Sequence, residues 1–228
     1  MNIAVIPARG GSKRIPKKNI KEFGGQPMIA WAISIAKSSR IFDYIIVSTD
    51  DQEVASIARK YGAQTPFIRP LSLSDDHTGT VPVISHAITE INNQKLFPDY
   101  VCCIYPCTPF LHTSDLSESL QLLKSTNSEF VYPVVEYPHP IFRSMRRTKD
   151  GRMEFIFPDN ELTRTQDLEQ TYHDAGQFYW GKSSAWLTMK RMHSDGISIV
   201  IPSWRTVDID TNDDWKRAEL LFNSVNKA

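Results

Sequence analysis

Residues 2–19 read NIAVIPARGGSKRIPKKN, and this stretch decides the fold class. Its first part, Asn2 to Pro7, is a nearly continuous apolar run, which is typical of a central parallel strand covered on both faces. Its second part combines two glycines with a high density of Arg and Lys. Because ligands bind at the carboxyl ends of strands in an open parallel sheet, this loop indicates a site for something small and strongly negative.

Strand-like and helix-like segments alternate beyond this loop. Apolar runs predict strands at 43–50, 65–68, 99–106, 129–135, 175–180 and 197–202. Helical periodicity predicts helices at 28–36, 51–61, 80–92, 114–124 and 183–191, and from Asn212 onward. Asp50 followed by Glu53 resembles a capping box for the second helix. The alternation predicts an α/β fold with a doubly wound, mostly parallel sheet and helices on both faces.

Residues from about 136 to 172 break the alternation. The segment is rich in proline and clustered charge and holds only the short strand-like run RMEFIF. Its apolar side chains have no helix face to cover, namely Tyr137, Ile141, Phe142, Met145, Phe155 and Phe157. Isolated two-stranded elements are marginal in water, and a two-fold partner with the same segment is the simplest cover. We therefore expect one domain over 1–228 with an inserted dimerisation arm at about 136–172, and a homodimer.

Composition excludes several classes of protein. Lys plus Arg and Asp plus Glu are both 26 in 228 residues, and this balance argues against a nucleic-acid binder that uses 9–21 and 143–152 as basic patches. No apolar run approaches the roughly 20 residues of a membrane span, so we expect a cytoplasmic protein with no membrane partner. Cys102, Cys103 and Cys107 fit neither a disulfide framework nor a zinc site, and we expect reduced, mostly buried thiols.

The basic loop has the chemistry of a polyphosphate site. Gly10 and Gly11 permit close approach of the backbone and unusual dihedrals, so that successive N–H groups can point at phosphate oxygens. The surrounding cations can then neutralise the phosphates; they are Arg9, Lys13, Arg14, Lys17 and Lys18. The spacing matches neither the P-loop nor the dinucleotide-binding motif. The alternative is a solvated basic turn.

The segment TVDIDT near the C-terminus suggests a metal site. A strand's two-residue period puts Asp208 and Asp210 on one face, where two carboxylates repel each other unless a cation lies between them. Mg²⁺ prefers oxygen ligands and shares them with substrate phosphates. Two unpaired surface acids are the alternative. Thr211 and Asp214 fit an N-cap arrangement for the last helix.

Several segments, in this order, resemble motifs of the sugar-acid cytidylyltransferases, which make CMP-activated sialic acids and Kdo. They are IPARGGSKRIPKKN, RPLSLSDDHTGTVPVISHAI, IYPCTPFL, RTQDLEQTYHDAGQFYW and VDIDTNDDW, within about residues 2–222. The combination is specific, although no single motif is. The resemblance implies a Rossmann-like nucleotidyltransferase fold, an arm-exchanged dimer, and an enzyme that uses CTP and a sugar acid as substrates.

The resemblance also implies roles for individual residues. Mg²⁺ would lie on Asp208 and Asp210; Arg9, Lys18 and Asp210 would be catalytic, with Lys18 near the α-phosphate. Asp210 is also a candidate base for the sugar hydroxyl, a role that the sequence does not separate from metal binding. Nucleotide binding falls to Ala8, Arg9, Gly10, Gly11, Ser12, Lys13, Lys18, Asn19, Arg69 and Thr80.

The sugar half of the site departs from the sialic acid enzymes. Tyr105 stands where they have Gln, Thr165 replaces the second Arg of Arg-Arg-Gln-Asp, and Ala175-Gly176 replaces Asn-Gly. RTQDLEQTYHDAGQFYWG looks most like the pseudaminic acid branch, whose substrate is a diacetamido nine-carbon sugar acid. The expected sugar-binding residues are Tyr105, Arg164, Gln166, His173, Asp174 and Gln177, with His173 and Asp174 as a possible pair. CMP-N-acylneuraminate or CMP-legionaminate synthesis and non-catalytic nucleotide binding remain as alternatives.

Overall fold

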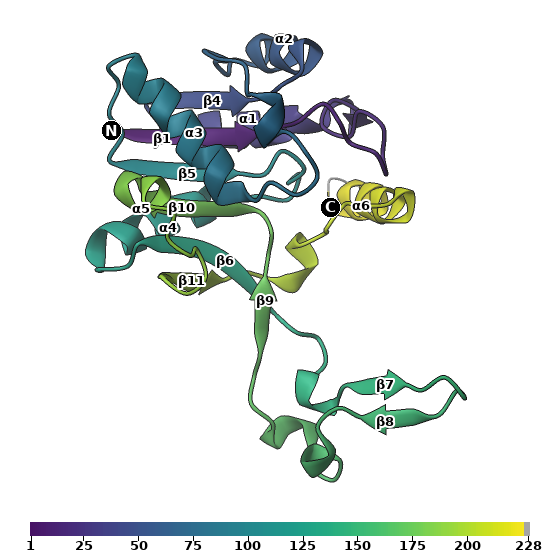
Figure 1. Ribbon diagram of the computed structural model, residues 1–228. Helices are drawn as coiled ribbons and strands as arrows, with labels where there is room; N and C mark the ends of the chain where they lie inside the picture. Colours follow the sequence, from purple (N-terminus) through teal and green to yellow (C-terminus); the bar gives the residue numbers. More distant parts are fainter. Residues whose placement is uncertain (226–228) are drawn as a thin grey trace.

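A seven-stranded sheet forms the centre of the computed structural model, which describes residues 1–225 (Figure 1). The strand order is β11-β6-β10-β5-β1-β4, and β9 pairs with β6 beside β10. The strands are β1 (Asn2–Pro7), β4 (Tyr44–Ser48), β5 (Tyr100–Ile104), β6 (Phe130–Glu136), β9 (Tyr172–Asp174), β10 (Phe178–Lys182) and β11 (Gly196–Val200). The predicted apolar run at Asn2–Pro7 is thus a central strand, with parallel neighbours on both sides.

The sheet is mixed, which corrects the expectation of a doubly wound, mostly parallel sheet. β1 pairs in parallel with β4 and β5, and β6 with β11. β10 is antiparallel to both β5 and β6, and β9 is antiparallel to β6. The cause is the connection, because the chain leaves β6, traverses residues 137–171 and returns directly along β6. Without a crossover helix the returning strands must be antiparallel.

Helices cover both faces of the sheet, as the alternation predicts. They are α1 (Met28–Ser39), α2 (Gln52–Lys60), α3 (Thr80–Asn93), α4 (Thr113–Ser125), α5 (Ser183–Leu187) and α6 (Asn212–Val225). Buried side chains of α1 and α4 pack on one face, and those of α3 and α5 on the other. α6 instead packs over a smaller cluster that includes Ile15, Phe23 and Ile209, next to the hairpin of β2 (Glu22–Phe23) and β3 (Gln26–Pro27).

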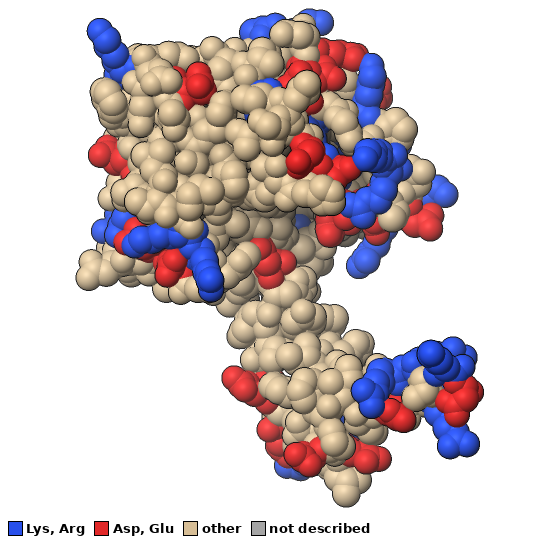
Figure 2. Space-filling view, in the orientation of Figure 1, with Lys and Arg blue, Asp and Glu red and all other residues tan. Residues whose placement is uncertain are grey.

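The arm, residues 137–171, extends away from the body and carries a cluster of basic side chains at one end (Figures 1 and 2). Its two ends are adjacent, since Glu136 pairs with Tyr172 and the Tyr137 N–H donates to the Thr171 carbonyl at 3.0 Å. It contains the hairpin of β7 (Met145–Arg147) and β8 (Met153–Phe155). Several of its apolar side chains are exposed: Tyr137, Met145, Met153, Ile156, Phe157 and Leu162.

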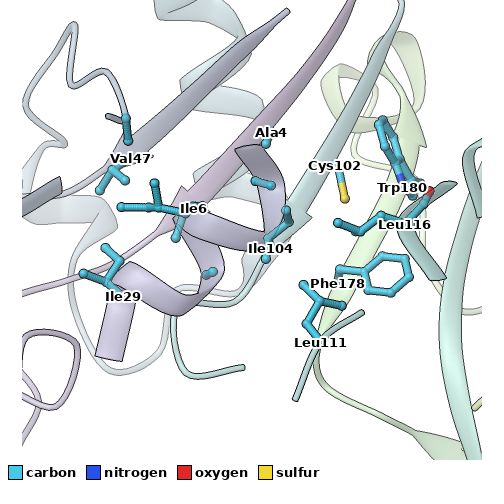
Figure 3. Close-up of a cluster of buried hydrophobic side chains, with 14 of the residues drawn as sticks. Ala4, Ile6, Ile29, Val47, Cys102, Ile104, Leu111, Leu116, Phe178 and Trp180 are labelled. Carbon is cyan, nitrogen blue, oxygen red and sulfur yellow. Dashed lines mark hydrogen bonds between the residues drawn. The ribbon is translucent and has the colours of Figure 1, made fainter. Parts of the chain in front are cut away.

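The larger core cluster consists of buried side chains from the sheet and from the helices on one of its faces. Ala4 and Ile6 of β1, Ile104 of β5 and Trp180 of β10 meet Ile29 of α1 and Leu116 of α4 (Figure 3). All six are 0% exposed. The indole of Trp180 donates to the Leu116 carbonyl at 3.0 Å, so this large side chain leaves no unpaired donor in the core.

Some local predictions are wrong at the ends of elements. Residues 65–68 form no strand; a single bridge joins Ile46 to Gln64, since Pro66 lacks the N–H that a longer pairing needs. The helix from residue 183 ends at Leu187 rather than 191, and Met189 follows with φ +57°. The N-cap of α2 is Asp51, whose carboxylate accepts from the Glu53 and Val54 N–H groups; it is not Asp50.

The cysteines agree with the expectation of unpaired, mostly buried thiols. Cys102 and Cys103 are buried on β5 and Cys107 is half-buried, all three as free thiols, and burial raises their pKa values. Within residues 1–225, every helix is too short or too polar to cross a bilayer.

Candidate active site

A cavity of about 1150 Å³ opens at the carboxyl ends of β1, β5 and β6, where the topology of an α/β sheet gathers its loops. Pro7, Tyr105 and Glu136 mark the three strand ends, and the loop after β1 and residues 203–210 form much of the wall. The predicted site residues that line it are Arg9, Ser12, Lys13, Lys18, Asn19, Tyr105, His173, Asp174, Asp208 and Asp210. The fold therefore brings four separate predicted motifs to one cavity.

The loop after β1 is fixed by the start of α2. The Gly10 N–H donates to the Asp50 carboxylate at 3.0 Å, and a Cβ at Gly10 would collide with the Asp51 side chain. Gly10 is therefore required for the close approach of this loop to Asp51; neither Gly10 nor Gly11 has the unusual, positive φ that the sequence predicts. The left-handed residue of the loop is Lys17, at φ +54°. Neither glycine nor Ala8 is among the residues that line the cavity.

Acids from other segments neutralise the cations of the loop. Arg9 Nη1 lies 2.6 Å from Asp76 Oδ1, and Lys13 Nζ lies 2.5 Å from Asp76 Oδ2. The hydrogen bonds from Lys13 and Arg9 lower the pKa of Asp76 to about 2, so this carboxylate is ionised at neutral pH. Arg14 pairs with Asp210 at 2.8 Å. A phosphate in the cavity would compete with these carboxylates for the same cations.

Lys18 and Asn19 connect this loop to the rest of the cavity wall. Lys18 Nζ donates to the Ile209 carbonyl at 2.6 Å and lies 3.4 Å from Asp210 Oδ1. The buried Asn19 amide donates to the Arg9 carbonyl at 2.9 Å, and the Cys107 thiol donates to Asn19 Oδ1 at 3.5 Å. The amine of Lys18 thus connects the basic loop, to which Lys18 belongs, with the segment that carries the two carboxylates near the C-terminus.

Asp208 and Asp210 face the cavity although their segment is not a strand. Residues 206–210 form no strand, contrary to the prediction; Ile209 is buried under α6, and Asp208 and Asp210 line the cavity together with Val207 and Ile209. Burial, and then the charge of Asp210, raise the pKa of Asp208. Beyond them, the Thr211 and Asp214 side chains accept from each other's backbone N–H, which is the predicted capping arrangement.

These carboxylates fit the expected Mg²⁺. They are hard oxygen donors, and their mutual repulsion is only partly offset by Lys18 and Arg14. No group of three or more His, Cys, Asp or Glu side chains suited to a metal occurs among residues 1–225. Mg²⁺ commonly takes one or two carboxylates and completes its shell with substrate phosphates and water, so this donor set suits an ion held jointly with a nucleotide.

Arg69 and Thr80 lie behind the cavity wall rather than on it. Arg69 is 4% exposed; its Nε donates to Ser74 Oγ at 3.1 Å and its Nη2 lies 3.8 Å from Asp50 Oδ1. Burial lowers the pKa of Arg69, and Asp50 opposes that shift. Thr80 begins α3, and its hydroxyl lies 2.6 Å from the Tyr105 hydroxyl.

Of the predicted sugar-binding residues, Tyr105, His173 and Asp174 line the cavity. His173 Nδ1 lies 3.0 Å from the Asp174 backbone carbonyl, and in the described part of the chain the two side chains of the predicted pair form no hydrogen bond or ion pair with each other. The Asp174 carboxylate contacts the Gly176 N–H, the Tyr179 hydroxyl and His193 Nε2, each at 2.7 Å.

The other predicted sugar-binding residues do not line this cavity. Gln177 is buried, and its amide donates to the Arg205 carbonyl at 2.7 Å. Arg164 and Gln166 lie on the arm, where Arg164 pairs with Asp167 at 2.8 Å. Gln166 lines a second cavity of about 350 Å³ at the base of the arm.

Sequence reasoning missed three residues around the main cavity. Trp204 lines the cavity and is 48% exposed. A tryptophan four residues before the paired acids could have been recognised in the sequence as part of a binding surface. His193 reaches Asp174 across 19 residues of sequence, and no local pattern predicts that contact. Arg205 forms a buried ion pair with Asp115, whereas its residue type favours the surface.

Comparisons with known proteins agree with this geometry. A family model described as cytidylyltransferase matches residues 3–193. The chain is 39% identical to a pseudaminic acid cytidylyltransferase of Campylobacter jejuni subsp. jejuni serotype O:23/36 (strain 81-176), over 97% of this chain and 96% of the relative. It is 29% identical to a CMP-N,N'-diacetyllegionaminic acid synthase of Legionella pneumophila, over 99% and 98%. A solved CMP:2-keto-3-deoxy-manno-octonic acid synthetase complexed with CTP has the same fold, with a TM-score of 0.71, 16% identity and 98% of each chain covered.

Proposed function

Because the chain belongs to the cytidylyltransferase family, we propose that it transfers CMP from CTP to a nonulosonic sugar acid. The observation that carries the proposal is one cavity lined by the basic loop, the Asp208–Asp210 pair and the tyrosine-bearing end of β5. In the reaction, the anomeric hydroxyl oxygen of the sugar bonds to the α-phosphorus of CTP, and the bond from that phosphorus to the bridging oxygen of the β-phosphate breaks. Pyrophosphate leaves with that electron pair, and the hydroxyl proton passes to a base.

The basic loop binds the triphosphate in this proposal. Arg9 and Lys13 release Asp76 and contact phosphate oxygens, since both cations already hold a carboxylate at 2.5–2.6 Å. Lys18 lies against Asp210 and the Ile209 carbonyl, which suits a contact near the α-phosphate. Catalysis of this kind comes mainly from positioning and from stabilising charge.

Asp208 and Asp210 would hold Mg²⁺, which offsets phosphate charge when bound. Asp210 is also our candidate base for the sugar hydroxyl. On the nucleotide side, Asn19, Arg69 and Thr80 are the candidates for recognition of cytosine and ribose, together with the backbone of Ala8, Gly10, Gly11 and Ser12. The Nη2 of Arg69 has no hydrogen bond among the described residues, but it is buried 3.8 Å from Asp50 Oδ1, so a nucleotide would reach it only after a side chain of the wall moves.

Pseudaminic acid is the sugar that we propose. The Tyr105 hydroxyl is engaged by Thr80, so its ring remains to face a sugar, and the Asp174 carboxylate is occupied by three donors. Much of the nearby wall is apolar: Val135, Pro138, Ala175 and Trp204. A wall with few free hydrogen-bonding groups suits a sugar that carries acetamido and methyl groups in place of hydroxyls.

The arm makes a homodimer in our proposal and brings Arg164 and Gln166 toward the partner's sugar site. Its exposed apolar side chains need cover, and neither Arg164 nor Gln166 lines the main cavity of its own chain. Arg143, Arg146 and Arg147 are further candidates for the partner's substrate carboxylate.

The test is pyrophosphate release from CTP and Mg²⁺ with a panel of pseudaminic, legionaminic and N-acetylneuraminic acids. We expect turnover with pseudaminic acid to exceed that with the others. Tyr105→Gln should narrow the ratio of kcat/KM values between pseudaminic and N-acetylneuraminic acid by about tenfold. If the protein binds CTP but releases no pyrophosphate from it with any of these sugars, it is a non-catalytic nucleotide-binding protein.

A further inference from the structure

The segment 203–210 carries both predicted metal carboxylates but has no strand pairing to hold it in place. Downstream it is anchored by the capping box of α6 and by the buried Ile209. Upstream it is anchored by Arg205, which is the one buried charged residue of the segment. Whatever fixes Arg205 therefore fixes the approach of the chain to Asp208 and Asp210.

Arg205 is held from two sides. Its Nη1 and Nη2 lie 2.6 and 3.2 Å from the two carboxylate oxygens of Asp115, and both side chains are under a tenth exposed. Asp115 belongs to the first turn of α4, where a carboxylate also interacts favourably with the helix dipole. The backbone carbonyl of Arg205 accepts from the side-chain amide of Gln177. Gln177 is buried and is the last residue of the loop 174–177, directly before β10.

The composition of this cluster is a poor choice for stability alone. Replacing a buried ion pair by apolar side chains of similar size is often neutral or stabilising. Arg205 Nε and Gln177 Oε1 are, in addition, buried without a hydrogen-bond partner within the described chain. A bidentate arginine–carboxylate pair gives direction that apolar packing does not, because both nitrogens must meet both oxygens in one plane.

We propose that Arg205, Asp115 and Gln177 form a positioning clamp that sets Asp208 and Asp210 relative to the sugar wall of the cavity. The inference rests on the proposed function. α4 is packed on the sheet through Leu116 and Leu120. The clamp therefore fixes the position of the two carboxylates relative to a helix that is itself held by the core. Gln177 ties the same point to the loop that carries Asp174. Since Lys18 also bonds to the Ile209 carbonyl, a displaced segment would move Lys18 as well.

The decisive variant is the apolar double replacement Asp115→Leu/Arg205→Met, which removes the pair without leaving one charge buried alone. We expect it to keep its circular dichroism spectrum and its melting transition. Its kcat should fall at least tenfold, and the Mg²⁺ concentration for half-maximal activity should rise about tenfold. Binding of Mn²⁺ with CTP, measured by electron paramagnetic resonance without turnover, should weaken by a similar factor.

Gln177→Met provides a second test of the clamp if the double variant fails to fold. It removes one N–H donor and nearly preserves volume, and we expect a two- to fivefold weaker binding of Mn²⁺ with CTP. Arg205→Lys keeps the charge but not the bidentate geometry. Its binding of Mn²⁺ with CTP should therefore lie between that of the wild type and that of the double variant. The matched control is Glu129→Met/Lys190→Met, which removes an ion pair of 3.2 Å at the far end of β6 from the cavity.

Wild-type Mg²⁺ dependence and Mn²⁺ binding in a folded double variant, or in Gln177→Met, would overturn the clamp and leave a structural ion pair. An absence of pyrophosphate release by the wild-type protein would count against the proposed function alone. The resonance measurement would still report whether the clamp sets the metal and nucleotide site.

Discussion

The body and the arm contain similar apolar residues but bury them to opposite degrees. Leu116 of the body is 0% exposed, between β10 and α4, whereas Leu162 of the arm is 95% exposed. The inner strands of the body, β1, β5, β6 and β10, have partners on both sides, while β7 and β8 have only each other. The burial of an apolar side chain can thus be predicted from the sequence only when the residues that cover it belong to the same chain. In our proposal, a second molecule covers the exposed apolar side chains of the arm.

The first way to sharpen this contrast is a matched pair of truncations. Leu116→Ala should lower the free energy of unfolding by about 2–5 kcal/mol, because it leaves a cavity in the core. Leu162→Ala should change it by less than about 0.5 kcal/mol. Chemical denaturation of both variants at low protein concentration checks the difference. Equal losses would mean that Leu162 is buried within the protomer.

The second prediction concerns the chemistry, which we assign to the body. Asp210→Asn should lower kcat by about 10²-fold, or about 2.7 kcal/mol, because it removes a metal ligand and our candidate base. Asp208→Asn should have a comparable effect. Sedimentation and melting behaviour should stay unchanged, since neither residue contacts the arm.

Asp213→Asn is the control for these variants, since Asp213 is an acid of the same segment with a side chain that is 96% exposed. It should keep wild-type turnover. Wild-type turnover in Asp208→Asn and Asp210→Asn, or in excess chelator, would contradict the metal assignment.

The third prediction separates assembly from nucleotide binding. Replacing residues 137–171 by a short Gly-Ser linker is feasible because the Tyr137 N–H and the Thr171 carbonyl are hydrogen-bonded at 3.0 Å. We expect a monomer whose CTP affinity, measured by titration calorimetry, stays within about threefold of the wild type. Its turnover with sugar should fall about tenfold or more, because a misplaced substrate loses positioning.

Sedimentation equilibrium gives the oligomeric state of both proteins. A wild-type monomer of 26.0 kDa with full activity would refute the dimer and its shared sugar site together.

The smallest effect belongs to Asp76, the carboxylate that occupies the basic loop. Asp76→Asn removes an anion that competes with phosphate, so CTP should bind about two- to fivefold more tightly. The folded pKa of Asp76 is depressed to about 2, so its pairing persists above the ordinary carboxyl pKa and is lost only as the pH falls toward 2. The affinity gain should therefore be the same at pH 6 and pH 8. Calorimetric titrations at both values measure it, and a weaker affinity would assign Asp76 to nucleotide binding.

The sequence predicts the body's elements well because each one buries its own periodic stripe. The direction of β10 escapes prediction, because the run FYWGK reads equally well in a parallel or an antiparallel strand. Only the connection through the arm decides it. In the same way, composition gives no means to choose between Asp50 and Asp51 as the cap of α2; the choice follows from the Gly10 N–H that Asp50 accepts.

For the site, the sequence predicts the residues that carry charge toward the cavity and misses those that orient them. Lys18, Asp208 and Asp210 stand in dense, polar motifs that have few structural uses. Arg205 stands in ordinary surroundings, and its burial depends on Asp115 of α4, which lies far away in the chain. The sequence predicts Gln177 as a sugar-binding residue but does not predict its bond to the Arg205 carbonyl. Contacts of this range leave no local periodicity to read.

The position of β10 has a consequence for the order in which the protein is made. β10 lies between β5 and β6, yet residues 178–182 leave the ribosome after both neighbours and after the whole arm. Until then β5 and β6 each present an unpaired edge, and such edges are prone to pair with other chains. The arm's length thus sets a delay during synthesis in which the nascent sheet is split in two. A shortened arm would close that interval earlier, with less opportunity for aggregation.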